Sequence, residues 1–219
     1  METEIRTTQT KEPEKPAKKL IFIAHAANSA EAIKKALEAG ADFVEIDVWK
    51  AITRKILTVE HQWVVGSLGF GAELKNVLAD ELIRANGRLY FDFKFGGIKG
   101  AYDLVEFLRQ HGLGKPTIAS TDWQTLVKLN QQQGVKPHFT IARPSDLEKF
   151  LKEEEGFNLI GEKGISIRHT LLTPKLIQHF CDRDFEIVAW TVDGRDRAQE
   201  LEEMGVDGIV SNNLTLADR

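Results

Sequence analysis

The sequence predicts an α/β fold, a single (β/α)8 barrel of the TIM type, and three observations lead to that prediction. Short apolar runs alternate with segments of helical period, which is typical of strand–helix units joined into a parallel sheet. About eight such units follow residue 20, and eight units favour a closed barrel. The chain has 219 residues, which leaves little room for a second domain beside one barrel.

The predicted strands are short runs rich in β-branched and aromatic residues. In chain order they cover residues 20–24, 43–48, 56–59, 88–95, 116–120, 138–142, 164–167, 185–192 and 208–210. The alternative is an open, doubly wound sheet with extra strands. A dinucleotide-binding sheet of that type carries a G-x-G-x-x-G loop after its first strand. The corresponding loop here, residues 25–29, contains no glycine.

The predicted helices lie between the strands and follow the rules for helix caps. The first begins after an N-cap at Ser29 and stops at Gly40. Pro174 lies in the first turn of a later helix, and Ser145 is the predicted N-cap of another. After the first helix, the predicted segments are 73–86, 102–111, 123–133, 145–155, 174–183 and 196–204.

Composition and charge narrow the possible partners and the cellular location. The formal net charge is −4, from 29 basic and 33 acidic residues, which gives no reason to expect nucleic acid. The single cysteine, Cys181, cannot form an intrachain disulfide, and we expect a half-buried thiol on a helix. Residues 1–19 are polar and are predicted to be a disordered tail before a barrel domain over 20–219. We find no signal peptide or membrane span, and we expect a cytoplasmic protein.

Ionisable side chains occur where buried parallel strands should be apolar. They lie toward the ends of the first predicted strands and are His25, Glu45, Asp47, His61, Asp92 and Lys94. Residues two apart on a strand point to the same side, which holds for the E-x-D and D-x-K pairs. In a barrel, the C-terminal strand ends meet over one mouth, where active sites form. The sequence therefore predicts one cluster at that mouth.

The predicted cluster suits phosphodiester chemistry. Its three carboxylates are the hard oxygen ligands that Mg²⁺ or Ca²⁺ accepts, and together they would be costly without a cation. The two histidines can divide the work of general base and general acid. Lys94 and a divalent ion can hold phosphate oxygens as charge develops. The structural alternative is a buried salt bridge between the E-x-D pair and Lys94.

Beyond this cluster, the sequence resembles the glycerophosphodiester phosphodiesterase superfamily. The most specific match is residues 36–48, a helix end that leads into the E-x-D strand. Residues 23–25 are similar to the opening strand and histidine of the family, and His61 falls at its second histidine. Residues 188–192 and 205–210 resemble its last two strands. The resemblance covers about residues 20–215 and implies a phosphoric diester hydrolase on a TIM barrel.

Departures from that pattern resemble the sphingomyelinase D/phospholipase D toxin branch. The first loop has Ala26 and Ala27 where glycerophosphodiesterases have Arg-Gly, so one phosphate-binding arginine is missing. The His-x-x-Asn pattern ending at Asn28, the D-x-K pattern and Asn212 are similar to the toxin branch. Against that branch, the chain is shorter and lacks the cysteines of its disulfides.

The resemblance also implies roles for individual residues. We expect Glu45, Asp47 and Asp92 to bind one Mg²⁺ or Ca²⁺, and His25 and His61 to act as acid and base. The predicted substrate-binding residues are Lys94 for the phosphate, Trp190 for stacking on an alcohol or choline group, and Asn212 as a hydrogen-bond donor.

The expected substrate is a small glycerophosphodiester or a lysophospholipid. The apolar segment 63–70 after the second histidine is predicted to be a loop that can receive one acyl chain. Two alternatives stay open. One is toxin-like headgroup cleavage that yields a cyclic phosphate, and the other is a non-catalytic barrel that binds phosphate or a lipid headgroup.

Overall fold

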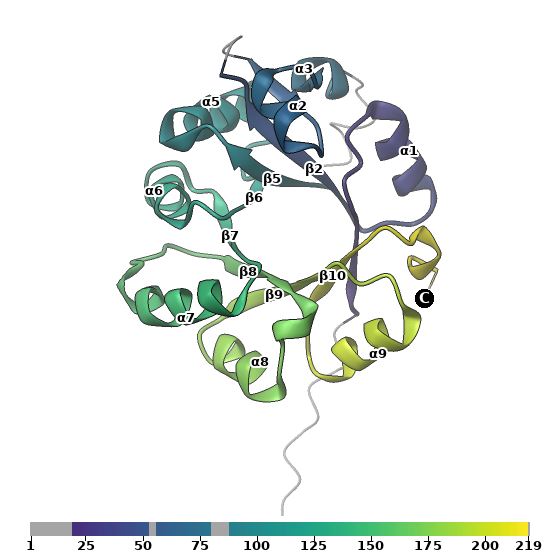
Figure 1. Cartoon of the computed structure of the whole chain (residues 1–219), viewed down its shortest axis with the longest axis vertical. Coiled ribbons are helices and arrows are strands. Elements are labelled where there is room, and N and C mark those ends of the chain that lie inside the picture. The colour runs from purple at the N-terminus through teal and green to yellow at the C-terminus, as the bar shows by residue number, and fades with distance from the viewer. Residues whose placement is uncertain (1–18, 53–55, 80–87, 219) are drawn as a thin grey trace, which may run out of the picture.

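The computed structural model describes residues 19–52, 56–79 and 88–218. The predicted disordered tail, residues 1–19, lies outside this range apart from Lys19, as does the second half of the predicted helix 73–86, residues 80–86. Within the described residues, eight parallel strands form a closed ring, because β1 pairs with β10 on one side and with β2 on the other. The predicted TIM-type barrel is confirmed (Figure 1).

The ring strands match the predicted apolar runs to within a few residues. Around the ring they are β1 (Ile21–Ala24), β2 (Phe43–Lys50), β5 (Leu89–Phe95), β6 (Thr117–Ser120), β7 (Lys136–Ile141), β8 (Lys163–Arg168), β9 (Phe185–Trp190) and β10 (Gly208–Ser211). Since all eight are parallel in the described structure, their C-terminal ends lie at one mouth.

Helices cover the outside of the ring, as Figure 1 shows. They are α1 (Ala30–Glu38), α5 (Gly97–Gln110), α6 (Trp123–Gln133), α7 (Pro144–Glu153), α8 (Pro174–Cys181) and α9 (Arg195–Glu203), with short 3-10 turns at Glu154–Gly156, His169–Leu171 and Leu214–Leu216. The Ser29 hydroxyl accepts from the backbone N–H of Ala32, which confirms the predicted N-cap of α1. None of the helices in the described ranges is long and apolar enough to span a bilayer.

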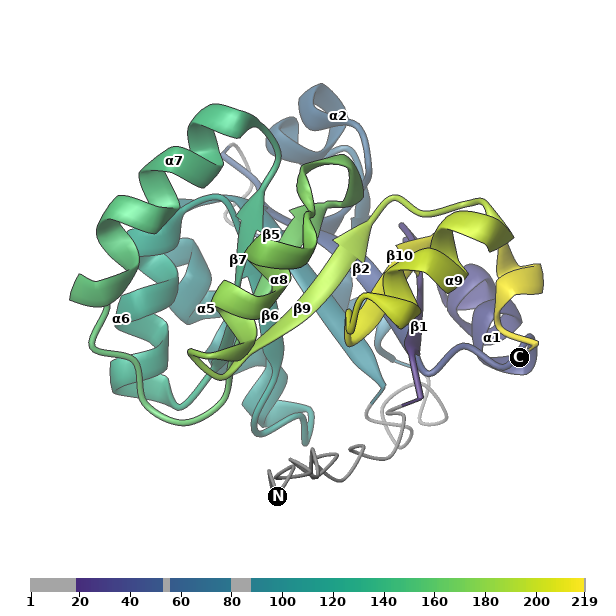
Figure 2. The same ribbon diagram turned by 90° about the horizontal axis from the view of Figure 1, so that it is seen from below.

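One excursion leaves the ring after β2. The predicted strand 56–59 is β3 (Leu57–Val59), which pairs antiparallel with β2 and lies outside the ring. The predicted apolar loop contains a short helix, α2 (Trp63–Leu68), followed by β4 (Ala72–Glu73) and α3 (Leu74–Val77). Figure 2 shows α2 at the end of the barrel toward which the arrowheads of β7 and β9 point. The excursion therefore rises beside the mouth.

Three local predictions were wrong. The N-cap of α7 is Arg143 rather than Ser145, because Pro144 suits the first helical position and the Asp146 carboxylate accepts from the backbone N–H of Arg143 at 2.9 Å. Helix α5 begins at Gly97, before the predicted residue 102. Cys181 is exposed instead of half-buried, because the last turn of α8 directs it away from the core.

The core has an outer and an inner layer. The outer layer packs between strands and helices and holds most of the buried apolar side chains. The inner layer fills the ring itself, and its buried members are Ile23, Tyr90, Ala119, Val188 and Val210. The ring is therefore a packed core, and chemistry is confined to its mouth.

The ring also encloses a histidine beside this inner layer. His138 on β7 is fully buried, with its Nδ1 at 3.0 Å from the Tyr90 hydroxyl. Its ring packs against Gly164 so closely that a Cβ there would lie 2.4 Å from Nε2. Burial, and secondarily the positive charge of Lys136, lowers the pKa of His138 from 6.5 to about 3.

This buried histidine predicts acid sensitivity of the fold. Its pKa is lower in the folded chain than in the unfolded chain, so stability is lost as pH falls below about 6.5. The expected loss is about 2 kcal/mol between pH 7 and pH 5, from about 1.4 kcal/mol per unit. Urea unfolding at both pH values should show a smaller loss for His138→Gln than for the wild type. An equal loss in the variant would show that His138 is not the cause, and His111→Gln, at a half-buried histidine outside the ring, is the control.

Candidate active site

The predicted carboxylates meet at the mouth of the barrel. Glu45 and Asp47 lie two residues apart on β2, and Asp92 occupies β5 beside them. Asp47 pairs in register with Asp92, so alternate side chains of both strands point into the same end of the ring. One oxygen from each of the three carboxylates lies within 4.8 Å of the other two.

Lys94 brings a positive charge into this cluster. Its ammonium forms an ion pair with Asp47 at 2.8 Å and a second one with Asp92. Burial alone would lower the pKa of Lys94, but the surrounding carboxylates raise it above its ordinary value. The ammonium is therefore charged at neutral pH.

The two carboxylates of β2 differ in charge state. Burial raises the pKa of Asp47, but Lys94 and the hydrogen-bond donors Asn28 and His61 hold it below its ordinary value. For Glu45, burial and the negative charges of Asp92 and Asp47 raise the pKa from 4.5 to about 8. Glu45 is therefore mostly protonated at neutral pH when Lys94 is the neighbouring cation.

The cluster fits a hard divalent cation. Carboxylate oxygens are the ligands that Mg²⁺ and Ca²⁺ prefer. One ammonium among three buried or half-buried carboxylates leaves excess negative charge, which the raised pKa of Glu45 reflects. A bound divalent cation would attract the ionised form of Glu45 and lower that pKa. Cys181, the only cysteine, lies on α8 and offers no thiolate to this site.

His25 follows the last residue of β1 and lies beside Glu45. Its backbone N–H donates to the Ser211 carbonyl at 2.9 Å, which ties the end of β1 to the end of β10. Ala26 adopts a left-handed φ of 50°, and its N–H donates to Glu45 Oε2 at 3.0 Å. His25 Nε2 lies 3.5 Å from the same oxygen. The turn after β1 therefore holds both the histidine and the carboxylate.

A hydrogen-bonded chain behind His25 determines which ring nitrogen carries its proton. His25 Nδ1 lies 2.8 Å from Asn212 Oδ1. Asp193 orients that amide, because its carboxylate accepts from Asn212 Nδ2 at 3.0 Å and from the Asn212 backbone N–H at 2.8 Å. The amide oxygen therefore faces His25, so Nδ1 donates, and Nε2, which lies 3.5 Å from Glu45 Oε2, is the nitrogen that faces the carboxylate cluster.

His61 is held by the excursion outside the ring. Trp49 Nε1 donates to the Glu60 carbonyl at 2.5 Å, and Glu60 Oε1 accepts from the His61 backbone N–H at 2.8 Å. Gly66 of α2 packs on the Trp49 indole, where a Cβ would lie 2.5 Å from the ring. His61 Nδ1 donates to Asp47 Oδ2 at 2.9 Å, and 59% of its side chain stays exposed. Its Nε2 is thus available to a ligand.

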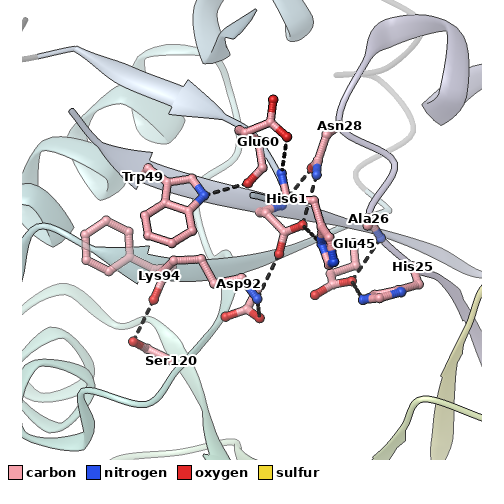
Figure 3. Close-up of polar contacts among 12 residues, drawn as sticks. His25, Ala26, Asn28, Glu45, Trp49, Glu60, His61, Asp92, Lys94 and Ser120 are labelled. Carbon is pink, nitrogen blue, oxygen red and sulfur yellow. Dashed lines mark hydrogen bonds and ion pairs between the residues drawn. The ribbon is translucent and has the colours of Figure 1, made fainter. Parts of the chain in front are cut away.

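The two imidazoles lie side by side over the carboxylates (Figure 3). The ring centroids of His25 and His61 are 5.4 Å apart, and the ring planes are perpendicular. Both rings donate through Nδ1 to an oxygen, so Nε2 is the second nitrogen of each; that of His25 lies beside Glu45, and that of His61 belongs to a side chain that is 59% exposed. This arrangement can accept one proton and donate another on a group bound between the rings and the cluster.

The structure joins seven of the eight predicted site residues through direct contacts or one intermediate residue: His25, Glu45, Asp47, His61, Asp92, Lys94 and Asn212. The eighth, Trp190, lies at the end of β9 and packs on the inner core layer. Its indole ring is covered by the Arg168 guanidinium at 5.6 Å from the ring centroid.

Three further residues at the mouth were given no role from the sequence, although one of them, Asn28, ends the His-x-x-Asn pattern noted there. Asn28 donates to Asp47 Oδ2 at 2.9 Å and accepts from the Asp47 backbone N–H at 2.9 Å. Asp193 and Arg168 each come directly after a predicted strand, 185–192 and 164–167. A charged residue at that position is the signal that could have identified both.

A family model for the glycerophosphoryl diester phosphodiesterase family matches residues 91–216, more than half of the chain. The matched region begins in β5 and includes Asp92 and Lys94. His25, His61 and the two carboxylates of β2 precede it, so their roles do not follow from this match. No curated protein sequence matches the chain.

Solved structures with the same fold come from several bacteria. A phosphodiesterase of Oleispira antarctica, in complex with the product sn-glycerol-3-phosphate, has a TM-score of 0.72 at 14% identity, over 92% of this chain and 96% of that one. A glycerophosphodiester phosphodiesterase of Parabacteroides distasonis has a TM-score of 0.72 at 17% identity, with 92% and 96% covered. The corresponding Thermotoga maritima structure has a TM-score of 0.67 at 18% identity, with 90% and 96% covered.

The structural matches share the barrel over nearly the whole length of both chains, although their identities are low enough to show the fold alone. The sequence match is independent of them and covers six of the eight ring strands of the described structure, from β5 onward. The resemblance inferred from the sequence is therefore confirmed: this chain belongs to the glycerophosphoryl diester phosphodiesterase family and is a phosphoric diester hydrolase.

Proposed function

We propose that this chain cleaves glycerophosphodiesters or lysophospholipids with two histidines and one divalent cation, Mg²⁺ or Ca²⁺. The observation that carries the proposal is the position of His25 and His61, whose rings lie 5.4 Å apart beside one carboxylate cluster. Such a pair can act on one phosphodiester, with one imidazole as the general base toward the attacking hydroxyl and the other as the general acid toward the leaving oxygen.

The carboxylates Glu45, Asp47 and Asp92 would hold the cation. When bound, a divalent cation polarises a phosphoryl oxygen and stabilises charge that develops on it. Lys94, between Asp47 and Asp92, supplies an ammonium for a second nonbridging oxygen. Asn28 fixes the Asp47 carboxylate through its amide, so the ligand set is oriented before any ligand arrives.

The histidines move the protons. One imidazole accepts a proton at Nε2 from the attacking hydroxyl, while the other, protonated at Nε2, donates to the leaving oxygen. Asp47 keeps the proton of His61 on Nδ1, and Asn212, oriented by Asp193, does the same for His25. We therefore propose that Asn212 positions His25.

The substrate assignment is supported by features around the mouth. Leu68, the last residue of α2, and Phe70, just after that helix, are 38% and 69% exposed and lie beyond His61 in the chain. An apolar rim of this kind suits a single acyl chain or a small diester better than a bilayer lipid. The Oleispira antarctica relative was solved with sn-glycerol-3-phosphate, the product expected of a glycerophosphodiester.

A second candidate is headgroup cleavage of the sphingomyelinase D type, in which a substrate hydroxyl attacks and a cyclic phosphate forms. The observation in its favour is that two residues shared with that branch have contacts in the site. Asn28 hydrogen bonds to Asp47, and Asn212 hydrogen bonds to His25. Both contacts are expected if the two asparagines help to position the catalytic and metal-binding side chains.

Phosphorus NMR with Mg²⁺ or Ca²⁺ tests both candidates on three substrates that share choline phosphate. We expect glycerophosphocholine or lysophosphatidylcholine to be cleaved faster than sphingomyelin vesicles, because the site favours small or single-chain substrates. Faster cleavage of sphingomyelin, with a cyclic phosphate resonance, would instead support the second candidate. No cleavage of any substrate would favour a barrel that only binds a phosphate or headgroup.

A further inference from the structure

Arg168 ends β8 at the mouth of the barrel. Two residues before it, Ser166 is buried and hydrogen bonds to the Tyr90 hydroxyl of the inner core layer. Because side chains alternate along a strand, Arg168 lies on the same inward side as Ser166, at the C-terminal end. It is paired in register with Trp190, which ends the neighbouring strand β9. The arginine therefore belongs to the rim of the mouth.

The ring places Arg168 across the mouth from the carboxylates. In the strand order of the described barrel, β8 lies four strands from β2 in either direction. Glu45 and Asp47 are on β2, so Arg168 faces them from the opposite wall. A diester whose phosphate contacts the carboxylate side can therefore extend one of its two alcohol groups toward Arg168.

The charge of Arg168 is not cancelled by an ion pair. No carboxylate in the described ranges forms a salt bridge with it, and its guanidinium lies over the Trp190 ring at 5.6 Å from the centroid. The neighbouring cation Arg197 pairs with Glu200 at 2.6 Å and donates to His169 Nδ1 at 3.2 Å. Burial, then the charges of Arg197 and Arg168, lowers the pKa of His169 against the opposing charges of Asp193 and Glu200.

The covered indole changes the expectation for Trp190. A quaternary ammonium such as choline binds the face of an aromatic ring. Here a guanidinium already occupies a face of Trp190, and a cationic headgroup would have to displace it against like-charge repulsion. An anionic headgroup would instead gain charge-assisted hydrogen bonds from the guanidinium, which binds carboxylate or phosphate in bidentate fashion.

We propose that Arg168 is a specificity-determining residue that selects substrates whose leaving alcohol carries a negative charge, a carboxylate or a second phosphate. This inference rests on the proposed function, because it assigns the substrate class of the same site. It predicts that kcat/KM is highest for an anionic alcohol group, intermediate for a neutral one and lowest for a cationic one.

The test compares three glycerophosphodiesters under one condition: glycerophosphoinositol 4-phosphate, glycerophosphoglycerol and glycerophosphocholine. Wild-type kcat/KM should fall in that order. Arg168→Gln should lose about tenfold on the anionic substrate, the size of one charge-assisted hydrogen bond, and lose nothing on the choline substrate. Arg168→Glu should reverse the order. Arg109→Gln, at the C-terminal end of α5, is the matched control and should keep the wild-type order.

Values of kcat/KM that do not depend on the charge of the alcohol group would overturn the inference. So would a wild-type order of kcat/KM that persists in Arg168→Glu. A separate measurement distinguishes this outcome from failure of the proposed function. Calorimetry in excess chelator should detect binding of myo-inositol 4-phosphate to the wild type and about tenfold weaker binding to Arg168→Gln. If no diester is cleaved but this difference persists, the proposed function fails and the anion site stands. Equal binding to both proteins rejects the site.

Discussion

Replacement of His61 or His25 by alanine is expected to lower kcat by about 10²-fold or more, the usual contribution of a general acid or base. The fold should survive, because 59% of the His61 side chain is exposed and His25 lies in a turn at the strand end. The measurement is the rate of cleavage of the best substrate under saturating conditions, with thermal unfolding to verify folding.

The pH dependence distinguishes the two roles. A wild type that uses one imidazole as base and the other as acid should show a bell-shaped profile of kcat/KM. Each alanine variant should lose one limb of that bell. His179→Ala, on α8 away from the mouth, should keep both limbs. Near-normal turnover in either active-site variant would remove that histidine from the mechanism.

Chelation is expected to abolish activity, and added Mg²⁺ or Ca²⁺ to restore it. Three carboxylates within 4.8 Å of one another share one lysine, so the site is short of positive charge. Asp47→Asn should lose activity by about 10²-fold or more, since it removes a ligand and the acceptor for His61. Asp182→Asn, at the end of α8, is the matched control. Full activity in excess chelator would reject the metal assignment.

Metal binding also has a readout that does not need turnover. The pKa of Glu45 without metal is about 8, so the carboxyl is mostly protonated at pH 7 and must lose its proton to bind a cation. Calorimetry in buffers of different ionisation enthalpy should therefore report release of about one proton at pH 7. Affinity should rise with pH up to about pH 8. The release should disappear in Glu45→Gln.

The same carboxyl affects the stability of the metal-free protein. Because the pKa of Glu45 is higher in the folded chain than its ordinary 4.5, its contribution to stability is complete below pH 4.5 and is lost as pH rises toward 8. Glu45→Gln should remove that part of the pH dependence. The variant therefore separates loss of the metal site from loss of the fold.

Much of the fold could be predicted because its signals are local. Apolar runs and helix caps located the ring strands and α6 to within a few residues, since β-strands and helices impose periods of 2 and 3.6 on the chain. The same period placed Glu45 and Asp47 on one side of β2. The wrong predictions also concerned local features. Ser145 was predicted as the N-cap of α7, but Arg143 takes that position with Asp146 as its partner. Helix α5 begins at Gly97, earlier than predicted, because glycine is a residue type that disfavours helix and gives no signal of a helix start.

The sequence by itself determined the barrel class, the ionisable residues at the strand ends and the family they resemble. Only the tertiary structure decided that β3 lies outside the ring, that Asn212 and Asp193 support His25, and that Arg168 faces the carboxylates. His25 and Asn212 are 187 residues apart and meet because β1 pairs with β10. That pairing closes the ring through hydrogen bonds between distant segments, and such bonds leave no periodic pattern in the chain from which they could be predicted.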